Sequence, residues 1–389
     1  MRGVLSETVV ISRVSLASLR SRAGSSFVIV IAMACVVGVL VSVMSVASGL
    51  LRASRNGADP QNVIVLEEES INESGSISRE VSAVIVQAPG IAKGSDGRPL
   101  ADAEVLINLP PSEGFAQGTL FLRGIGAAGL SLRPQLRIVS GRLFRPGLRE
   151  LIVGVGAMGM FGLKVGDVVI LPDGEWPIVG AFSNGGGVLE SELVSDANTV
   201  MTSTRAETFN SVLVRLANPT DFDVFKRWVT ANPSLNLSVE RQTDFYIRTA
   251  VPFMSFFSAI ARFVAIILAI GALFGTLHIM YSSVSARTQE IGTLRALGYN
   301  ALPVAISIIV EAVLLSLTGA LIGASIAWLL FNGKRDLVTH TVFELAVTPQ
   351  LVYLGIMWAL VIGLIGAMLP AVRAGRLPIA DAIRAGSIR

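Results

Sequence analysis

Four charged residues stand out because they lie beside or inside strongly apolar stretches of the chain. Arg287, Glu290 and Arg295 belong to the sequence SARTQEIGTLRALGYN at residues 285–300, and Glu311 lies within the apolar stretch that follows. A guanidinium or carboxylate group in such surroundings forms an ion pair or binds a partner protein, because an unpaired charge is costly in an apolar medium. The chemistry that this pattern indicates is electrostatic binding.

Residues 286–297 are predicted to form a short helix. Ile291, Leu294 and Leu297 recur at helical spacing, and Gly298 opens a helix stop signal. We expect the charged residues of this helix to face water or a partner. A short, rigid helix between two membrane spans works as a lever, because a push on it moves both attached helices.

Glu311 has two interpretations. It lies about two turns from the start of its apolar stretch. Pairing with a nearby arginine or a neighbouring helix would therefore make it a packing latch. An ionisable residue inside a membrane is also a candidate for moving a proton or a substrate.

The composition indicates a membrane protein without catalytic machinery. The 389 residues are 52% hydrophobic and 15% charged, against about 25% charged in soluble domains. The sequence contains no GxxxxGK[ST], HExxH or GxSxG motif. One cysteine, Cys35, and two histidines offer neither an intrachain disulfide nor a zinc site. We therefore expect no enzyme activity, no metal, no bound cofactor and no nucleic-acid partner.

Four stretches are long and apolar enough to cross a membrane, which takes about 20 residues. Such spans leave little room for a substrate path through the bilayer, and no inverted repeat is evident. The predicted divisions are a cytoplasmic N-terminal segment at 1–26, a first span at 27–51, an outer domain at 52–250, a stalk and second span at 251–281, a loop at 282–301, a third span at 302–331, a short outer loop at 332–350, a fourth span at 351–372 and a cytoplasmic tail at 373–389.

Basic residues predict the orientation. The N-terminal segment, the 282–301 loop and the tail together hold ten arginines and three acidic residues, whereas the outer domain holds 18 basic and 22 acidic residues. The positive-inside rule puts both termini in the cytoplasm and the large domain in the periplasm of an inner membrane. Residues 1–24 either form an amphipathic helix on the membrane surface or are a basic flank. Residues 46–48 could also form a signal-peptide cleavage site, but the preceding segment is long for one.

The outer domain is predicted to be α+β. Strands are expected at 62–68, 103–109, 210–216 and 235–241, with helices at 78–87 and 219–230. These elements form two β–α–β units resembling a split, ferredoxin-type fold, with a β-rich subdomain inserted at about 118–208. The glycine run at 185–187 indicates a mobile loop rather than a phosphate cradle, and the acidic residues of the domain are expected on a solvated surface.

Glycine pairs at four-residue spacing mark possible helix contacts within the spans. Gly271 and Gly275 form one pair, and Gly319 and Gly323 form another. We expect both pairs to pack against neighbouring helices. The chain has 38 glycines, however, so chance alone supplies some such pairs.

The lever sequence RTQEIGTLRALGYN resembles the R-x-x-E-I-x-x-L-R-A-x-G segment of the FtsX/MacB-type permeases of ABC transporters. The matching residues are Arg287, Glu290, Ile291, Leu294, Arg295, Ala296 and Gly298. The ending LPAVRAGRLPIADAIRAG at 369–386 resembles the end of the same family. The order of one span, a large outer domain and three further spans also resembles that of the family. The β–α–β units resemble the family's porter-like subdomain, and the inserted β-rich segment resembles its small outer subdomain.

This resemblance implies a permease subunit that docks on a cytoplasmic ATPase dimer through the 287–298 segment. ATP and magnesium would be bound by that separate ATPase, and its strokes would be relayed to the outer domain by mechanotransmission. A second permease chain, identical or related, would complete the complex, and a periplasmic fusion protein with an outer-membrane channel could extend it. The implied role is export or extraction of a periplasmic or membrane-derived substrate. Activation of a cell-wall hydrolase as by FtsX, lipoprotein release, and an anchored receptor without an ATPase are the alternatives.

Overall fold

The computed structural model describes residues 23–68, 70–109, 119–232, 235–297, 300–338 and 341–376. The chain divides into two compact units. A helical unit comprises the described parts of Met1–Ala47, Phe256–Asn332 and Ala346–Arg389, and an α/β unit comprises those of Ser48–Ser255 and Gly333–Leu345. The predicted N-terminal amphipathic segment lies almost entirely outside the described residues.

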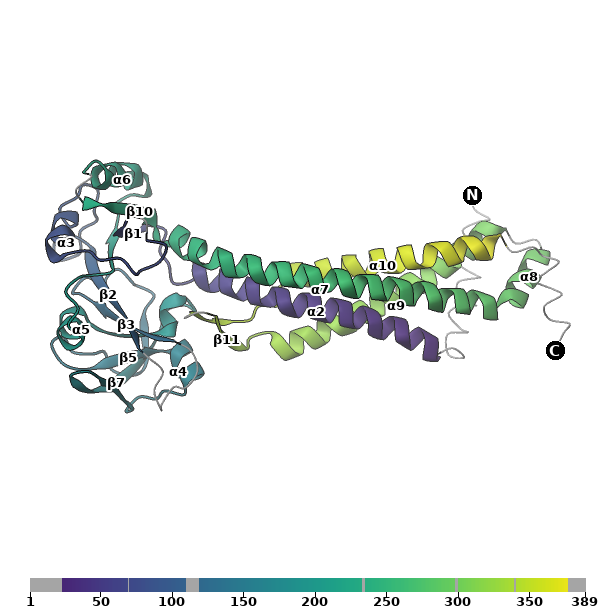
Figure 1. The fold of residues 1–389 in the computed structure, drawn as a ribbon, viewed down its shortest axis with the longest axis horizontal. Coiled ribbons are helices and arrows are strands. Elements are labelled where there is room, and N and C mark those ends of the chain that lie inside the picture. The colour runs from purple at the N-terminus through teal and green to yellow at the C-terminus, as the bar shows by residue number, and fades with distance from the viewer. Residues whose placement is uncertain are drawn as a thin grey trace. The chain divides into compact units, whose positions relative to one another are not determined.

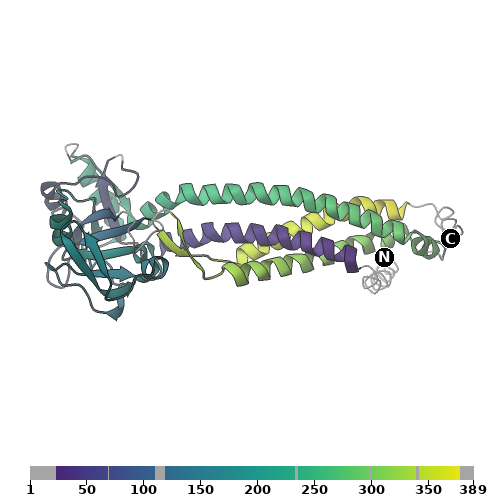
Figure 2. The ribbon, with the colours of Figure 1, turned by 60° about the horizontal axis from the view of Figure 1, so that its bottom comes forward.

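Within the described residues, four helices are long and apolar enough to cross a membrane. They are α2 (Ala23–Arg55), α7 (Gln242–Ala286), α9 (Ala301–Phe331) and α10 (Pro349–Gly375). Both ribbon views show them running side by side (Figures 1 and 2). At 1.5 Å per residue the 45 residues of α7 extend for about 68 Å, which is more than twice the hydrocarbon thickness. This length agrees with the predicted stalk that precedes the second span.

Small residues set the closest helix contacts within the helical unit. A Cβ atom added to Gly319 would collide with the backbone of α2 at Val30, and one added to Gly323 would collide with Ala34. A Cβ atom added to Gly363 of α10 would collide with the side chain of Ser316 in α9. Glycine is needed at these positions because it lets two helix backbones approach closely.

The other predicted glycine pair does not make such a contact. A Cβ atom at Gly271 or Gly275 would meet nothing within 4 Å in the described chain. The prediction of packing is therefore wrong for this pair within one chain. Spacing alone identifies which glycines share a helix face, but the bundle decides which face lies inside.

The α/β unit is built on one ten-stranded sheet. Its strands are β1 (Asn62–Glu67), β2 (Ala101–Leu109), β3 (Leu120–Ile125), β4 (Arg137–Gly141), β5 (Leu151–Gly154), β6 (Val168–Leu171), β7 (Gly174–Ser183), β8 (Glu192–Asp196), β9 (Ser211–Arg215) and β10 (Leu237–Arg241). Helices α3 (Arg79–Ile85), α4 (Val155–Phe161), α5 (Ala197–Thr204) and α6 (Phe222–Thr230) and the 3-10 turns η2 (Val188–Ser191) and η3 (Pro219–Asp221) connect them.

Two β–α–β units interleave at one end of the sheet, where the order is β10-β1-β9-β2. Both β10 and β9 are antiparallel to β1, and β2 is antiparallel to β9. The strands of each unit are therefore parallel to each other and separated by one strand of the other unit. The sequence marks these elements locally: Ser78 caps α3 by accepting a hydrogen bond from the Val81 amide.

The inserted segment does not form a separate sheet. Strand β3 pairs antiparallel with β2 and parallel with β8, and β5 and β7 extend the same sheet to β4. Strand β3, which follows the predicted boundary near residue 118, thus belongs to the same hydrogen-bonded sheet as β2. Strand pairing between distant segments is a tertiary property that local alternation does not reveal.

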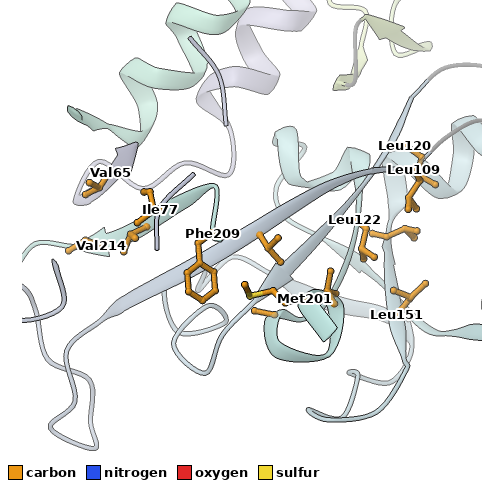
Figure 3. Packing of buried hydrophobic residues seen from close by; sticks show 14 of the residues in the cluster. Val65, Ile77, Leu109, Leu120, Leu122, Leu151, Met201, Phe209 and Val214 are labelled. Atoms are coloured by element: carbon orange, nitrogen blue, oxygen red, sulfur yellow. The ribbon is translucent and has the colours of Figure 1, made fainter. Parts of the chain in front are cut away.

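One face of this sheet forms the main core of the unit. Figure 3 shows buried side chains from both parts of the sheet in one cluster, among them Val65, Leu122 and Leu151, with Met201 and Phe209 from the connecting segments. The apolar residues that alternate along β2 point into the same cluster. A shared core explains why the insertion folds together with the β–α–β units.

The predicted short outer loop contains a hairpin that belongs to the α/β unit. Strand β11 (Arg335–Val338) pairs antiparallel with β12 (Thr341–Glu344). The Ser191 hydroxyl accepts a hydrogen bond from the Val342 amide at 2.7 Å, and Arg335 donates to the Val155 carbonyl at 2.9 Å. The outer domain therefore extends beyond the predicted 52–250, since residues from the link between α9 and α10 complete it.

Candidate functional site

The short helix predicted at 286–297 is present as α8 (Thr288–Ala296), which follows α7 after a break at Arg287. Ile291 is buried, with 6% of its surface exposed, whereas Leu297 is 73% exposed. The expectation that both lie on one apolar face is therefore wrong. Six residues correspond to about 1.7 turns of a helix, so the side chains of Ile291 and Leu297 point in different directions. The Leu294 side chain and Gly298 lie outside the described part of the structure.

Arg287 was predicted to face water or a partner, but its side chain is buried. Its Nη1 lies 3.2 Å from Oε2 of Glu311, and the two side chains are only 8% and 5% exposed. This ion pair joins the start of α8 to α9. The structure thus provides the nearby arginine that one of the two interpretations of Glu311 requires, and it makes Glu311 part of the packing of the helical unit.

A second contact joins helices at the same end of the unit. The Arg373 guanidinium of α10 lies 5.5 Å from the ring centroid of Tyr281 in α7, within the range of a cation–π interaction. Residue Gly375, which ends α10, lies against Ala301 at the start of α9. These contacts and the Arg287–Glu311 pair connect α7, α8, α9 and α10 where α8 begins.

One side of α8 is exposed in the described structure. The exposed residues of α8 are Gln289, Glu290, Thr293 and Ala296, and Leu297, which follows the helix, is exposed as well. This surface combines a carboxylate with small and apolar groups, and it is backed by the buried Ile291. Such a surface can bind a protein through an ion pair and apolar contacts, but it contains no nucleophile paired with a base.

The α/β unit contains a buried ionic cluster that sequence reasoning missed. All five N–H groups of Arg123 in β3 are used: Nε and Nη2 donate to Glu192, Nη1 and Nη2 donate to Glu73, and Nη1 donates to Glu104. Arg133 donates to Glu104 at 2.8 Å. The expectation that the acidic residues of this domain are solvated is therefore wrong for this group.

Burial sets the ionisation of the carboxyl groups in this cluster. Burial and neighbouring carboxylates raise the pKa of Glu192 despite its bonds to Arg123. Burial also opposes ionisation of Glu73, but the charge and hydrogen bonds of Arg123 outweigh it and lower its pKa. Asp102, two residues before Glu104 on the same face of β2, has its pKa raised to about 7 by burial and by the charge of Glu104.

The cluster could have been suspected from alternation in β2. The sequence ADAEVLINL places Asp102 and Glu104 on one face and apolar residues on the other. This pattern normally indicates a solvated face, and the strand itself carries no sign that the face is covered. The residues that cover it, Arg123 and Arg133, come from β3 and from the segment after it.

The glycine run at 185–187, which the sequence predicts to be a mobile loop, is hydrogen-bonded to a carboxylate of the same domain. Oε1 of Glu190 accepts hydrogen bonds from the Ser183 hydroxyl and from the amides of Asn184 and Gly186. The backbone amides that could have held a phosphate thus surround a carboxylate of the protein itself. Among the described residues no group of three or more His, Cys, Asp and Glu side chains is arranged to hold a metal ion.

Comparisons with known proteins identify the C-terminal part of the chain. Residues 262–379 match the family described as FtsX-like permease C-terminal. The chain is 32% identical over 110 residues to the uncharacterized ABC transporter permease YknZ of Bacillus subtilis, which covers 28% of this chain and 27% of that protein. It is 32% identical over 109 residues to the macrolide export ATP-binding/permease protein MacB of Escherichia coli K12, covering 28% of this chain and 16% of that protein.

A solved structure is also similar to this chain. The extracellular domain of the noncanonic ABC-type transporter YknZ from Gram-positive bacteria matches 46% of the chain and 99% of that domain, with 16% identity and a TM-score of 0.35. The matched segments of the curated relatives span about a quarter of their length or less.

The segment that contains most of α7 together with α8, α9 and α10 is therefore similar to ABC-transporter permeases. The resemblance to the FtsX/MacB-type permeases is confirmed, and the segment 262–379 belongs to the FtsX-like permease C-terminal family. This segment contains α8, the Arg287–Glu311 pair, α9 and α10. Of the family-like ending, Pro370, Ala371 and Ala374 lie in α10, whereas Pro378, Ala382 and Arg384 lie outside the described residues.

Proposed function

We propose that this chain is the permease subunit of an ABC transporter that couples a separate cytoplasmic ATPase to movement of the α/β domain. The exposed side of α8 is the docking surface for the ATPase, and the movement drives export or extraction of a periplasmic or membrane-derived substrate. The observation that carries this proposal is the buried Arg287–Glu311 pair, which fixes α8 to α9 inside the segment that matches the permease family.

A lever must be rigidly attached to the parts that it moves. The backbone leaves α7 and enters α8 with only Arg287 between them, and the side chain of that same residue binds α9. A force on α8 therefore reaches two long helices at once. Because a buried ion pair is costly to break, α8 moves together with α9 rather than sliding past it.

The chain also offers a path from the helices to the α/β domain. Helices α2 and α7 are each continuous across the division between the two units. The hairpin of β11 and β12 belongs to the α/β unit and is joined by its two ends to α9 and α10. All four long helices are thus attached to this domain by the backbone, which supports mechanotransmission as the mechanism.

The partners and location follow from the same proposal. The ATPase binds ATP and magnesium, and α8 contacts one subunit of its dimer. A second permease chain, identical or related, provides the other contact, and both chain termini lie in the cytoplasm with the α/β domain in the periplasm. A fusion protein and an outer-membrane channel would receive the substrate in an envelope with two membranes.

Reversing the charge of Glu290 tests the docking surface. The variant Glu290→Lys should stay in the membrane but lose co-purification with the ATPase and the ATP turnover stimulated by the permease, because Glu290 is exposed on α8. Leu294→Asp should have the same effect. The control Ser285→Lys places one lysine at an exposed position before α8 and should keep both properties. Unchanged co-purification and turnover in Glu290→Lys would refute the proposal.

A further inference from the structure

The α/β unit contains a cavity of about 330 Å³ beside the Arg123 cluster. Glu73 and Glu192, two of the carboxylates bound to Arg123, form part of its wall. Their side chains are 8% and 2% exposed. The volume falls within the range of small-molecule sites, which is about 300–1,000 Å³.

The rest of the wall is largely aromatic and aliphatic. Phe121 comes from β3, and Phe245, Tyr246 and Phe253 come from the first four turns of α7. Burial raises the pKa of Tyr246 to about 12, so its hydroxyl stays protonated and neutral. The wall therefore offers aromatic faces beside carboxylates, the combination that recognises an organic cation.

The balance of charge around the cavity favours a cation over an anion. The cluster has three carboxylates, Glu73, Glu104 and Glu192, and two guanidinium groups, Arg123 and Arg133. It therefore has one negative charge in excess at a pH at which Glu192, whose pKa burial raises, is ionised, and no excess charge when Glu192 is protonated. The five N–H groups of Arg123 are all used, so this residue offers no further donor to an anion.

The cavity is open to ligands from solvent. Asn72, Ser74 and Phe253, all exposed, belong to its wall. A ligand can therefore enter without disturbing Arg123. Glu73 and Glu192 can attract a cationic group electrostatically while they keep their bonds to Arg123.

We propose that this cavity, the Glu73/Glu192 pocket, binds a small organic cation that has an apolar or aromatic body. The cationic group lies against the two carboxylates and the aromatic rings, and the apolar body fills the part of the cavity lined by Leu50 and Leu106. This binding needs neither an ATPase nor nucleotide. Its test is therefore independent of the function proposed above.

Equilibrium dialysis with matched probes tests the proposal. The full chain in lipid nanodiscs is dialysed against benzyltrimethylammonium and, separately, against phenylmethanesulfonate, which carries a negative group on the same benzyl body. Empty nanodiscs measure binding to lipid. We expect saturable binding of the cation, at least tenfold tighter than binding of the anion, because two carboxylates face the ligand.

Variants at exposed positions locate the site without removing a buried ion. Ser74→Lys puts an ammonium group on the wall of the pocket and should reduce affinity for the cation by at least tenfold. Ser140→Lys, an exposed position in β4, adds the same charge outside the wall and should leave affinity unchanged. Phe253→Ala should weaken binding by about fivefold, since a cation–π contact contributes about 1 kcal/mol.

Three results would overturn the proposal. One is the absence of saturable binding above that of empty nanodiscs, and another is equal affinity for the cation and the anion. The third is binding that Ser74→Lys and Ser140→Lys change to the same extent. Each outcome concerns the pocket alone, because no ATPase is present.

Discussion

Asp102 should make the stability of the central sheet depend on pH. Its carboxyl group is buried in β2, where Oδ2 accepts a hydrogen bond from the Gly126 amide at 2.8 Å. Burial and the charge of Glu104 raise its pKa to about 7. The variant Asp102→Asn keeps an oxygen that can accept from Gly126 but cannot ionise. Comparing the two proteins therefore isolates the cost of ionising Asp102.

The sign of the effect follows from the direction of the pKa shift. An unfolded aspartate has a pKa of about 3.9, so the native state holds a proton that the unfolded state has lost between about pH 4 and pH 7. The stability associated with the protonated group is fully present below about pH 4 and is lost as the pH rises through about 7. Relative to Asp102→Asn, the wild type should become less stable over this range.

The size of the effect can be estimated from the shift. A difference of about three pKa units corresponds to about 4 kcal/mol in total, of which about 2–3 kcal/mol falls between pH 5 and pH 8. Hydrogen exchange of residues 101–109, measured by mass spectrometry on the full chain, reports opening of β2. Comparison at equal pH cancels most of the pH dependence of the chemical exchange rate.

We expect the protection of β2 in Asp102→Asn, relative to wild type, to rise by roughly 30-fold or more from pH 5 to pH 8. The control Asp96→Asn changes an exposed aspartate in the same domain and should give a ratio that stays constant with pH. A constant ratio for Asp102→Asn as well, or a ratio that falls as the pH rises, would refute the reasoning about burial.

Three further predictions concern the helical unit and its orientation. Gly323→Leu should destabilise the bundle by about 1–3 kcal/mol or prevent folding, whereas Gly271→Leu should not, as thermal stability in detergent would show; equal losses would contradict the assigned contacts. Glu311→Gln should cost about 3–5 kcal/mol by leaving Arg287 buried without its carboxylate, and the double variant Arg287→Met with Glu311→Met should recover most of that loss; no recovery would argue against this pair. In a Cys35→Ala background, a membrane-impermeant thiol reagent should label Ser140→Cys, at an exposed position of the α/β domain, in intact cells but should not label Ser285→Cys. The reverse pattern would invert the topology.

Local sequence was sufficient for the elements whose signals are local. The spans at 302–331 and 351–372 lie within one residue and three residues, respectively, of the ends of α9 and α10 as observed. In a membrane, the backbone N–H and C=O groups of a long apolar run can all be hydrogen-bonded only in a helix or in a closed barrel. The apolar composition of such a run is therefore enough to predict a helix. The lever helix was predicted in the same way, from charges and a stop signal between two such runs.

Contacts between distant segments were decided only by the tertiary structure. Asp102 and Glu104 alternate with apolar residues as on a solvated face, yet Arg123 and Arg133 cover them. The hairpin at 335–344 joins a domain that ends, in sequence, some 80 residues earlier. Composition and periodicity alone predicted four long apolar helices and the short helix after Arg287, because these signals act over a few turns. Local motifs carried the resemblance to a permease family. Burial of a charge, the pairing of Arg287 with Glu311 and the choice between two glycine pairs depend on which segments meet, and only the folded chain decides that.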